Sequence, residues 1–227
     1  MEKDHDDDSF AAGSMAKNRV EALVDGIFGV AMTLLVLDVK LPQGLPLDTD
    51  AAMRAQLLGL TGNFRIYLIS FVVLGLYWIG HHMQFHLVRS VDRMMLWINL
   101  CFMFGVTMIP FSTSVLGEYG DLRSSAIVYG LNLLWLALVY WIQISYLERN
   151  PHLATAALTP VLAQKIKRRV MVFIAVPVIS VAVAFYDAWI AVHLYFVMAI
   201  VGFLPGKITR SKPGTSHAKA PIDPPSP

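Results

Sequence analysis

Long apolar runs separated by short polar segments dominate the hydrophobic pattern of this chain. A helix needs ~20 mainly apolar residues to cross ~30 Å of hydrocarbon, and four separate runs have that length. From residue 170 to 204 the chain stays apolar for roughly 35 residues, which suits two crossings joined at Asp187. The pattern therefore predicts an all-α integral membrane protein with six transmembrane helices. The predicted spans cover residues 20–41, 64–85, 94–116, 124–147, 170–186 and 188–204.

The polar segments complete the predicted organisation. Residues 1–16 are acidic and rich in small residues and are expected to be a disordered extension, followed by a six-span domain at residues 17–206. A Pro/Ser/Lys-rich tail, residues 207–227, is also expected to be disordered. A short helix is expected around Asp50–Leu58. The cluster Lys165–Arg169, in a linker at residues 150–169, is either a topology anchor against anionic headgroups or a site for a regulatory lipid.

Composition and charge support the membrane assignment. The chain is 56% hydrophobic and 15% charged, whereas soluble domains carry about 25% charged residues. Its net charge of +2 gives no support for nucleic-acid binding, and its single cysteine allows no intramolecular disulfide. Fourteen of the 18 Lys and Arg residues fall on one side of the predicted topology and four on the other. This asymmetry predicts an even number of spans, with both termini cytoplasmic.

Asp25 interrupts the first apolar run. A lone carboxylate inside a span costs a few kcal/mol, so it should face protein or water and have a partner. It could belong to a structural ion pair or polar cluster, or to a permeation or proton site. Partners at the same depth are His81, His82 and Asn99, and no third His or Cys joins the histidine pair at a metal-binding spacing. The sequence therefore predicts no metal centre.

A helical wheel at 100° per residue places a second stripe on another face of the same helix. It consists of Val30, Thr33, Leu34 and Leu37. Such a stripe is commonly a packing or lipid-facing surface. Repeated around a symmetry axis, it would instead form apolar constrictions and a ring of hydroxyls, which are the parts of a dewetting gate and a weak ion-coordinating layer.

The first helix also resembles a known family signature. Arg19-x-x-x-Leu-Val-Asp25, followed by Thr33-Leu-Leu-Val-Leu-Asp38, is similar to the start of the transmembrane-protein-175 family, its bacterial branch in particular. Tyr77-Trp78, His81-His82, Asn99 and Ile109-Pro110-Phe111 extend the likeness over three spans. The family pattern has Phe-Ser where this chain has Leu23-Val24. One hydrogen bond of the family's Arg–Ser–Asp cluster is therefore not expected here.

The resemblance implies a homotetramer in a bacterial plasma membrane, with a pore lined by the first helix and no cofactor other than permeating K⁺. It implies a passive, leak-type potassium channel, and a neutral hydroxyl ring should select K⁺ over Na⁺ only weakly. Val30, Leu34 and Leu37 become the predicted constrictions and Thr33 the selectivity position. The predicted structural polar cluster contains Arg19, Asp25, Trp78, His81, His82 and Asn99.

Three other functions fit the pattern less well. A proton-coupled secondary transporter could use Asp25 with His81 or His82, but the chain shows no inverted repeat and no paired broken helices. A membrane enzyme lacks a catalytic cluster at one depth. A non-conducting scaffold would be silent in bilayers under all ionic conditions.

Overall fold

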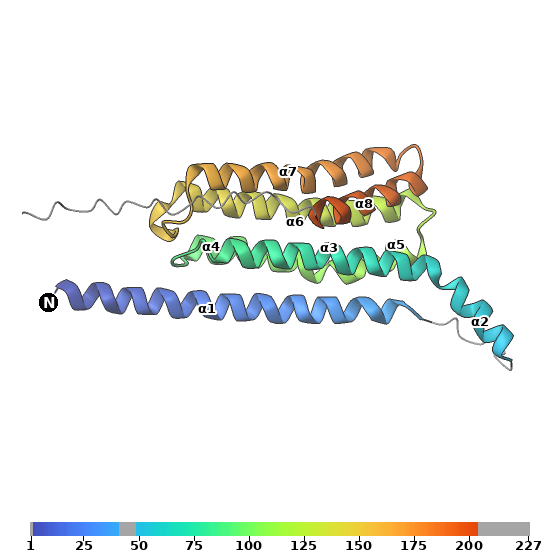
Figure 1. Ribbon diagram of the computed structural model, residues 1–227, viewed down its shortest axis with the longest axis horizontal. Helices are drawn as coiled ribbons and strands as arrows, with labels where there is room; N and C mark the ends of the chain where they lie inside the picture. The colour runs from blue at the N-terminus through green and yellow to red at the C-terminus, as the bar shows by residue number, and fades with distance from the viewer. Residues whose placement is uncertain (1, 41–48, 204–227) are drawn as a thin grey trace, which may run out of the picture.

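The computed structural model describes residues 2–40 and 49–203. Most of its helices run lengthwise beside one another in a bundle, and the short helix at residues 50–59 projects from one end (Figure 1). The expected tail at residues 207–227 lies outside the described residues. The elements are α1 (Glu2–Leu35), α2 (Asp50–Gly59), α3 (Thr61–Phe85), α4 (Arg93–Thr107), α5 (Ile109–Glu118), α6 (Arg123–Arg149), α7 (Pro160–Val183) and α8 (Ala188–Phe203), with 3-10 turns at Val36–Asp38 and Pro151–Leu153.

Three segments of the described chain are long and apolar enough to cross a membrane: Thr61–Phe85, Arg93–Glu118 and Arg123–Arg149. A shorter apolar helix covers Ala188–Met198. In α1 and α7 the uncharged stretch is short because acidic residues occur early in the first run and the basic cluster lies within the first turns of α7. The protein is thus an all-helical membrane protein.

Two helices begin earlier than the hydropathy predicts. The helix α1 starts at Glu2, so the residues expected to form a disordered extension continue the first helix instead. The helix α7 starts at Pro160 rather than near residue 170, because Thr159 caps it: the Leu162 backbone N–H donates to the Thr159 hydroxyl at 3.2 Å. The basic cluster is therefore helical.

The third predicted span is broken into two helices. The helix α4 ends at Thr107, and α5 begins at Ile109 with Pro110 in its first turn. Proline lacks a backbone N–H and its ring clashes with the preceding turn, so it interrupts the helical hydrogen-bond ladder. The interruption lies beside α1, because α1 packs against α4 and α5 as well as α3.

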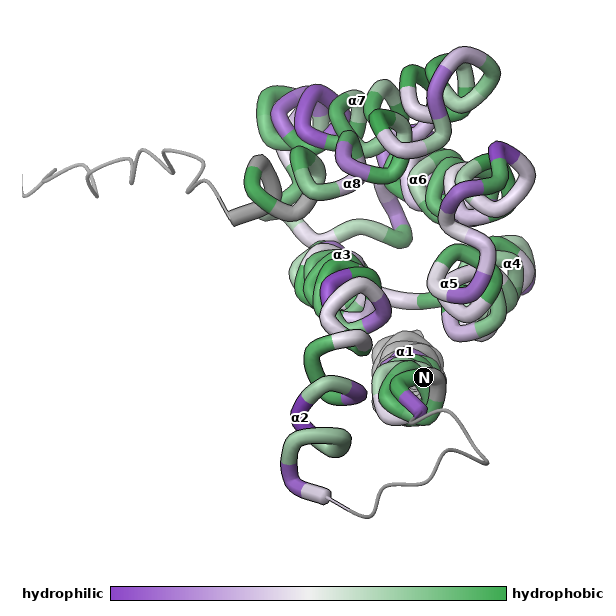
Figure 2. Tube along the Cα trace, turned by 90° about the vertical axis from the view of Figure 1, so that its right-hand side faces the viewer, coloured by the Kyte–Doolittle hydropathy of each residue, from purple (hydrophilic) through white to green (hydrophobic). Residues whose placement is uncertain are grey.

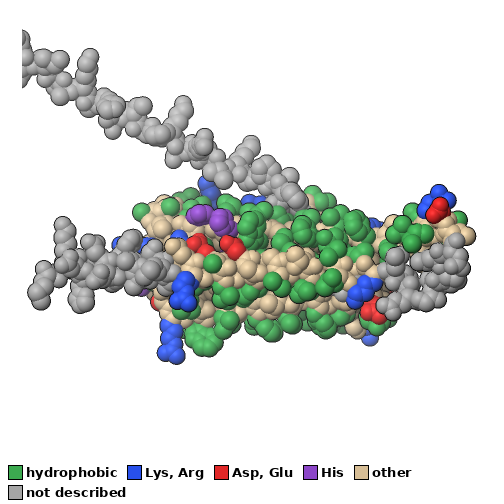
Figure 3. All heavy atoms as spheres, turned by 90° about the horizontal axis from the view of Figure 1, so that it is seen from below, with side chains coloured by type: hydrophobic (Ala, Val, Ile, Leu, Met, Phe, Trp, Pro, Cys, Tyr) green, Lys and Arg blue, Asp and Glu red, His purple; other side chains and the backbone are tan. Residues whose placement is uncertain are grey.

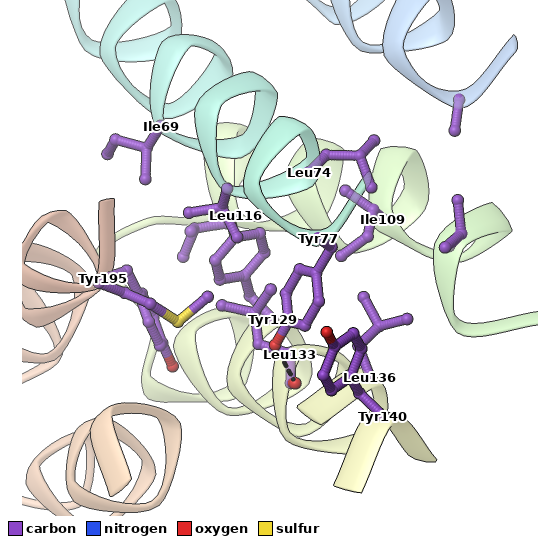
Figure 4. Close-up of a cluster of buried hydrophobic side chains, with 14 of the residues drawn as sticks. Ile69, Leu74, Tyr77, Ile109, Leu116, Tyr129, Leu133, Leu136, Tyr140 and Tyr195 are labelled. Atoms are coloured by element: carbon purple, nitrogen blue, oxygen red, sulfur yellow. Dashed lines mark hydrogen bonds between the residues drawn. The ribbon is translucent and has the colours of Figure 1, made fainter. Parts of the chain in front are cut away.

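The core lies between α3 and α6 and is rich in tyrosine (Figure 4). The Tyr77 hydroxyl donates to the Leu133 carbonyl at 2.9 Å, and the Tyr140 hydroxyl donates to the Gly80 carbonyl at 2.8 Å. These bonds satisfy the polar ends of large rings in an apolar interior, where an unpaired hydroxyl is costly. In the end-on view of Figure 2, α1 lies at the periphery of the bundle and α6, α7 and α8 lie on the opposite side.

One end of the bundle collects positive charge, and we call it the basic end. It carries Arg89, Arg93, Arg149 and the Lys165–Arg169 cluster, where α3 and α6 end and α4 and α7 begin. The connection between α3 and α4 pairs there with the connection between α6 and α7: the backbone N–H of Arg89 donates to the Leu153 carbonyl at 2.7 Å. A small apolar cluster fills the space beneath them, formed by Phe85, Val88, Met95, Leu147 and Leu153.

Candidate functional site

The helix α1 buries one stripe of its surface. Val24, Phe28, Ala31 and Leu35 are each no more than 2% exposed. Their spacing of four, three and four residues places them on one side of an α-helix. This side packs against α3, α4 and α5. Its burial anchors α1 to the subunit and determines which of its side chains face away.

The predicted stripe lies on the side that faces away. Val30, Leu34 and Leu37 are 59%, 43% and 57% exposed, and Thr33 is also exposed. Leu37 belongs to the 3-10 turn that continues α1, so its direction departs from the ideal wheel. In Figure 3 hydrophobic side chains, interspersed with backbone and other side chains, extend along the length of this side of the molecule, and histidine side chains lie beside acidic ones near one end. A continuous apolar face of this kind marks an interaction surface or a lipid contact.

The Thr33 hydroxyl has a defined orientation. It donates to the Val30 carbonyl one turn earlier, at 2.8 Å. A hydroxyl has one hydrogen and two acceptor lone pairs, so this bond uses the hydrogen and leaves the oxygen free to accept. The exposed face of α1 therefore presents an oxygen ligand between apolar side chains, and such an oxygen can coordinate a cation.

A groove of about 360 Å³ runs beside this face, between α1 and the α4–α5 junction. Leu23, Val30 and Leu34 line it from α1, and Thr107 and Pro110 line it from the junction. Gly26 also borders the groove, and a Cβ added to Gly26 or Gly29 would meet nothing within 4 Å. The missing side chains allow another helix to approach α1 closely.

Asp25 pairs with a neighbouring helix on the exposed side. The Trp78 indole N–H donates to Asp25 Oδ1 at 2.8 Å. The Trp78 ring stacks on His82 with a centroid distance of 5.9 Å, and His82 Nε2 lies 3.2 Å from His86 Nε2. The Asp25 carboxylate therefore has a donor within its own subunit, which lowers the cost of placing it in an apolar helix.

His81 belongs to a separate, fully buried group. Its Nε2 lies 2.8 Å from Asn99 Oδ1, and the Gln143 amide donates to the same oxygen at 3.5 Å. The imidazole is stacked between Phe85 and Phe102, with centroid distances of 4.5 and 5.0 Å. The group joins α3, α4 and α6 through polar contacts inside an apolar core, so it defines how these helices are rotated against one another.

The structure thus divides the predicted polar cluster. Asp25, Trp78 and His82 lie together at the surface, and His81 and Asn99 lie together in the core. Arg19 joins neither group: it forms no hydrogen bond or ion pair with the side chains that the structure describes. Val24, which stands where the family pattern has Ser, is buried among apolar residues. Valine has no hydroxyl, so it cannot form the hydrogen bond that a serine at this position would contribute to an Arg–Ser–Asp cluster.

Two members of these groups were not singled out from the sequence. Gln143 was missed, although a glutamine inside the predicted span at residues 124–147 is a polar residue that requires a buried partner. His86 was missed as well, although its spacing of four residues from His82 places both on one helix face. Within the described residues no group of three or more His, Cys, Asp or Glu side chains could hold a metal ion.

Asn99 offers a test of the buried group. Replacing Asn99 with leucine leaves His81 and Gln143 without their shared acceptor, and we expect it to destabilise the fold by about 1–3 kcal/mol. Thermal unfolding of purified protein in detergent measures this effect. The Asn99→Leu/His81→Leu double variant should lose less than the sum of the two single variants, since it removes both partners. Strict additivity would contradict a direct His81–Asn99 contact.

Comparison with known proteins places the chain among channels. A sequence profile described as endosomal/lysosomal potassium channel TMEM175 matches residues 19–110. A protein of Chamaesiphon minutus named potassium channel is 33% identical over 196 residues, 80% of this chain and 91% of that protein. A Chryseobacterium protein of the same name is 28% identical over 193 residues, 85% of this chain and 95% of that protein.

The fold matches as well. A crystal structure described as a lysosomal potassium-selective channel TMEM175 homolog from Chamaesiphon minutus superposes with a TM-score of 0.72 at 29% identity. The match covers 83% of this chain and 96% of that one. The profile covers α1 from residue 19 onwards together with α2, α3 and α4, and so includes the exposed stripe, the Asp25 group, His81 and Asn99. The chain therefore belongs to the TMEM175 family.

Proposed function

We propose that this protein is a passive potassium channel in which four copies of the chain surround a pore lined by α1. The single observation that supports this most is the exposed stripe of α1, which lies away from the buried stripe that anchors the helix. In a homotetramer the four stripes would meet at the symmetry axis. Val30, Leu34 and Leu37 would form apolar constrictions there. The potassium-channel names of the bacterial relatives support the same assignment.

Thr33 is the proposed selectivity position. Each hydroxyl already donates to the Val30 carbonyl, so four oxygens would face the axis as acceptors. They would replace part of the hydration shell of a permeating cation. Hydroxyl oxygens are neutral and make one layer only, so we expect a preference for K⁺ over Na⁺ that is weaker than in filters of stacked carbonyls. K⁺ is the proposed permeant ion, and no other ligand is needed.

The proposed topology has six spans, formed by α1, α3, α4 with α5, α6, α7 and α8. Its basic end would face the cytoplasm of a bacterium, since cytoplasmic loops carry the excess of Lys and Arg. Both termini would then be cytoplasmic. Arg89, Arg93, Arg149 and Lys165–Arg169 support this orientation because the helix order places them at one end.

The polar groups would brace the pore helix without lying on the ion path. Asp25 accepts a hydrogen bond from the Trp78 indole N–H, which does not relay protons at ordinary pH. His81 lies inside the core, stacked between two phenyl rings. This arrangement does not favour a proton-coupled transporter that would use Asp25 with His81, because the carboxylate and the buried imidazole have different partners. For His82, the hydrogen bond to the carboxylate comes from the Trp78 indole, which in turn stacks on His82.

Reversal potentials would test the proposal. Purified protein in planar bilayers with KCl on one side and NaCl on the other should pass current that reverses on the K⁺-selective side of zero. A tenfold permeability ratio shifts the reversal by roughly 59 mV, and we expect a shift of that order or smaller. Protein-free bilayers are the control. Reversal at zero would contradict selectivity, and silent bilayers under all ionic conditions would favour a scaffold.

A further inference from the structure

A cavity of about 380 Å³ lies apart from the α1 face, between α3, α6 and α7 near the basic end. This volume falls within the ~300–1,000 Å³ typical of small-molecule sites. The helix α8 packs against both α3 and α7, yet none of its described residues lines the cavity. Ile79 and Met83, about half exposed on α3, border it. The cavity is therefore reached from the lateral surface of the bundle.

The polarity of the wall changes along the cavity. Its deeper part is formed by Leu76, Tyr77 and Phe173, and the Tyr77 hydroxyl is already bonded to the Leu133 carbonyl. Tyr140 likewise uses its hydroxyl on the Gly80 carbonyl. Only hydrocarbon and ring faces remain for an occupant in this part. The space there suits an apolar chain.

Polar groups enter the wall on the basic-end side of Leu76 and Phe173, and the apolar Leu87, Leu162 and Ile166 line the cavity around and beyond them. Gln84 is only 1% exposed, and neither Nε2 nor Oε1 of its amide has a hydrogen-bond partner in the described protein. An unpaired buried amide is costly, so a partner from outside the subunit would relieve it. Arg169 lines the same cavity and supplies positive charge. Leu76 is ~12 Å from Gln84 along α3, at 1.5 Å per residue.

We propose that this cavity binds an anionic phospholipid from the leaflet at the basic end. The phosphate would pair with Arg169 and accept from the Gln84 amide, and one acyl chain would extend along Leu76 and Phe173. Gln84 and Arg169 lie on the basic-end side of Leu76 and Phe173, as the head of a lipid from that leaflet lies relative to its chain. The positive charge of Arg169 and of the cluster to which it belongs selects an anionic over a zwitterionic head. The site does not depend on ion conduction.

Lipid binding to the intact protein tests the proposal. Full-length protein in detergent would be titrated with dioleoylphosphatidylglycerol or dioleoylphosphatidylcholine, and intact-mass spectrometry would count the bound lipids per chain. We expect the wild type to retain phosphatidylglycerol in preference. Arg169→Ala should weaken that binding about tenfold, the usual scale for losing a charged hydrogen bond. Its matched control is Arg168→Ala, which removes the same charge from an exposed neighbour that does not line the cavity.

A second pair of measurements distinguishes binding of a whole lipid from binding of a phosphate group alone. Leu76→Trp fills the apolar part and leaves every charge in place, so it should also abolish phosphatidylglycerol retention; Met83→Trp at the lateral border serves the same purpose if Leu76→Trp does not fold. Inorganic phosphate should not displace the lipid. Equal losses in the Arg168 and Arg169 variants, displacement by phosphate, or retention in both tryptophan variants would each overturn the proposal. These experiments measure lipid binding and not conductance, so their results are independent of whether the protein is a channel.

Discussion

Replacing Thr33 with alanine should reduce the preference for K⁺ over Na⁺ close to unity while the protein still assembles and conducts. The Thr33 side chain is exposed, and among the described residues its hydroxyl bonds to the Val30 carbonyl alone, so its loss should cost the fold little. In the proposed pore four oxygen ligands would disappear together, and a cation would cross that layer with no replacement for its hydration shell. Reversal potentials in asymmetric KCl and NaCl measure the change.

Thr107→Ala is the matched control for this variant. Thr107 is also exposed, and its hydroxyl donates to the carbonyl three residues earlier, that of Phe104, at 2.8 Å. It lies on α4, beside the groove that borders the α1 stripe, whereas the proposed pore is lined by α1. Its selectivity should match that of the wild type. Unchanged selectivity in Thr33→Ala, or an equal loss in both variants, would remove Thr33 from the ion path.

Replacing Leu34 with alanine should raise the resting conductance by about tenfold or more. A ring of leucines narrows a pore and opposes wetting, and each 1.4 kcal/mol removed from a barrier is worth a factor of ten in rate. At ~0.8 kcal/mol per methylene, the apolar groups removed from four leucines together are worth more than the 1.4 kcal/mol that corresponds to a tenfold change. The substitution should spare the subunit fold, because Leu34 is 43% exposed. Ion flux from liposomes at fixed protein content gives the comparison.

Val36→Ala tests whether position on the helix matters. Val36 is 50% exposed and apolar, and it lies just beyond Leu35, outside the proposed pore stripe. Its truncation should leave flux near the wild-type value. A similar rise in both variants would point to a general loosening of α1, and no rise in Leu34→Ala would mean that the constriction lies elsewhere.

Several features of the fold follow from the chain without its coordinates. The all-α membrane character and the positions of most helices follow from hydropathy, because the bilayer imposes one length and one backbone geometry on any span. The second stripe of α1 was separated from Asp25 by the helical period alone. Helix ends are harder to predict from hydropathy. The early start of α7 depends on the Thr159 cap, which is a local hydrogen bond. The break at Pro110 divides an apolar run that hydropathy alone predicts as one helix.

The polar contacts depend on helix rotation, which the sequence alone does not define. Asp25, Trp78, His81 and Asn99 were expected in one cluster because they share a depth, and depth is readable from position along each span. Their division into a surface pair and a buried pair depends on how α3 is rotated, which turns Trp78 towards α1 and His81 towards α4 and α6. Rotation is decided by packing among several helices at once. Gln143 on α6 completes the buried pair, and only the packing of α6 against α4 shows which partner this buried amide has.

The sequence by itself determined that this is a helical membrane protein whose first helix carries both a carboxylate and a separate stripe of Val30, Thr33, Leu34 and Leu37. Periodicity and charge are local properties of the chain, so they can be read without knowing which helices touch. Only the tertiary structure decided that Val24, Phe28, Ala31 and Leu35 are the buried side of that helix, and hence that the stripe faces away from the subunit. It also decided where Arg169 and Gln84 meet an open cavity, because burial depends on the neighbours that packing brings together.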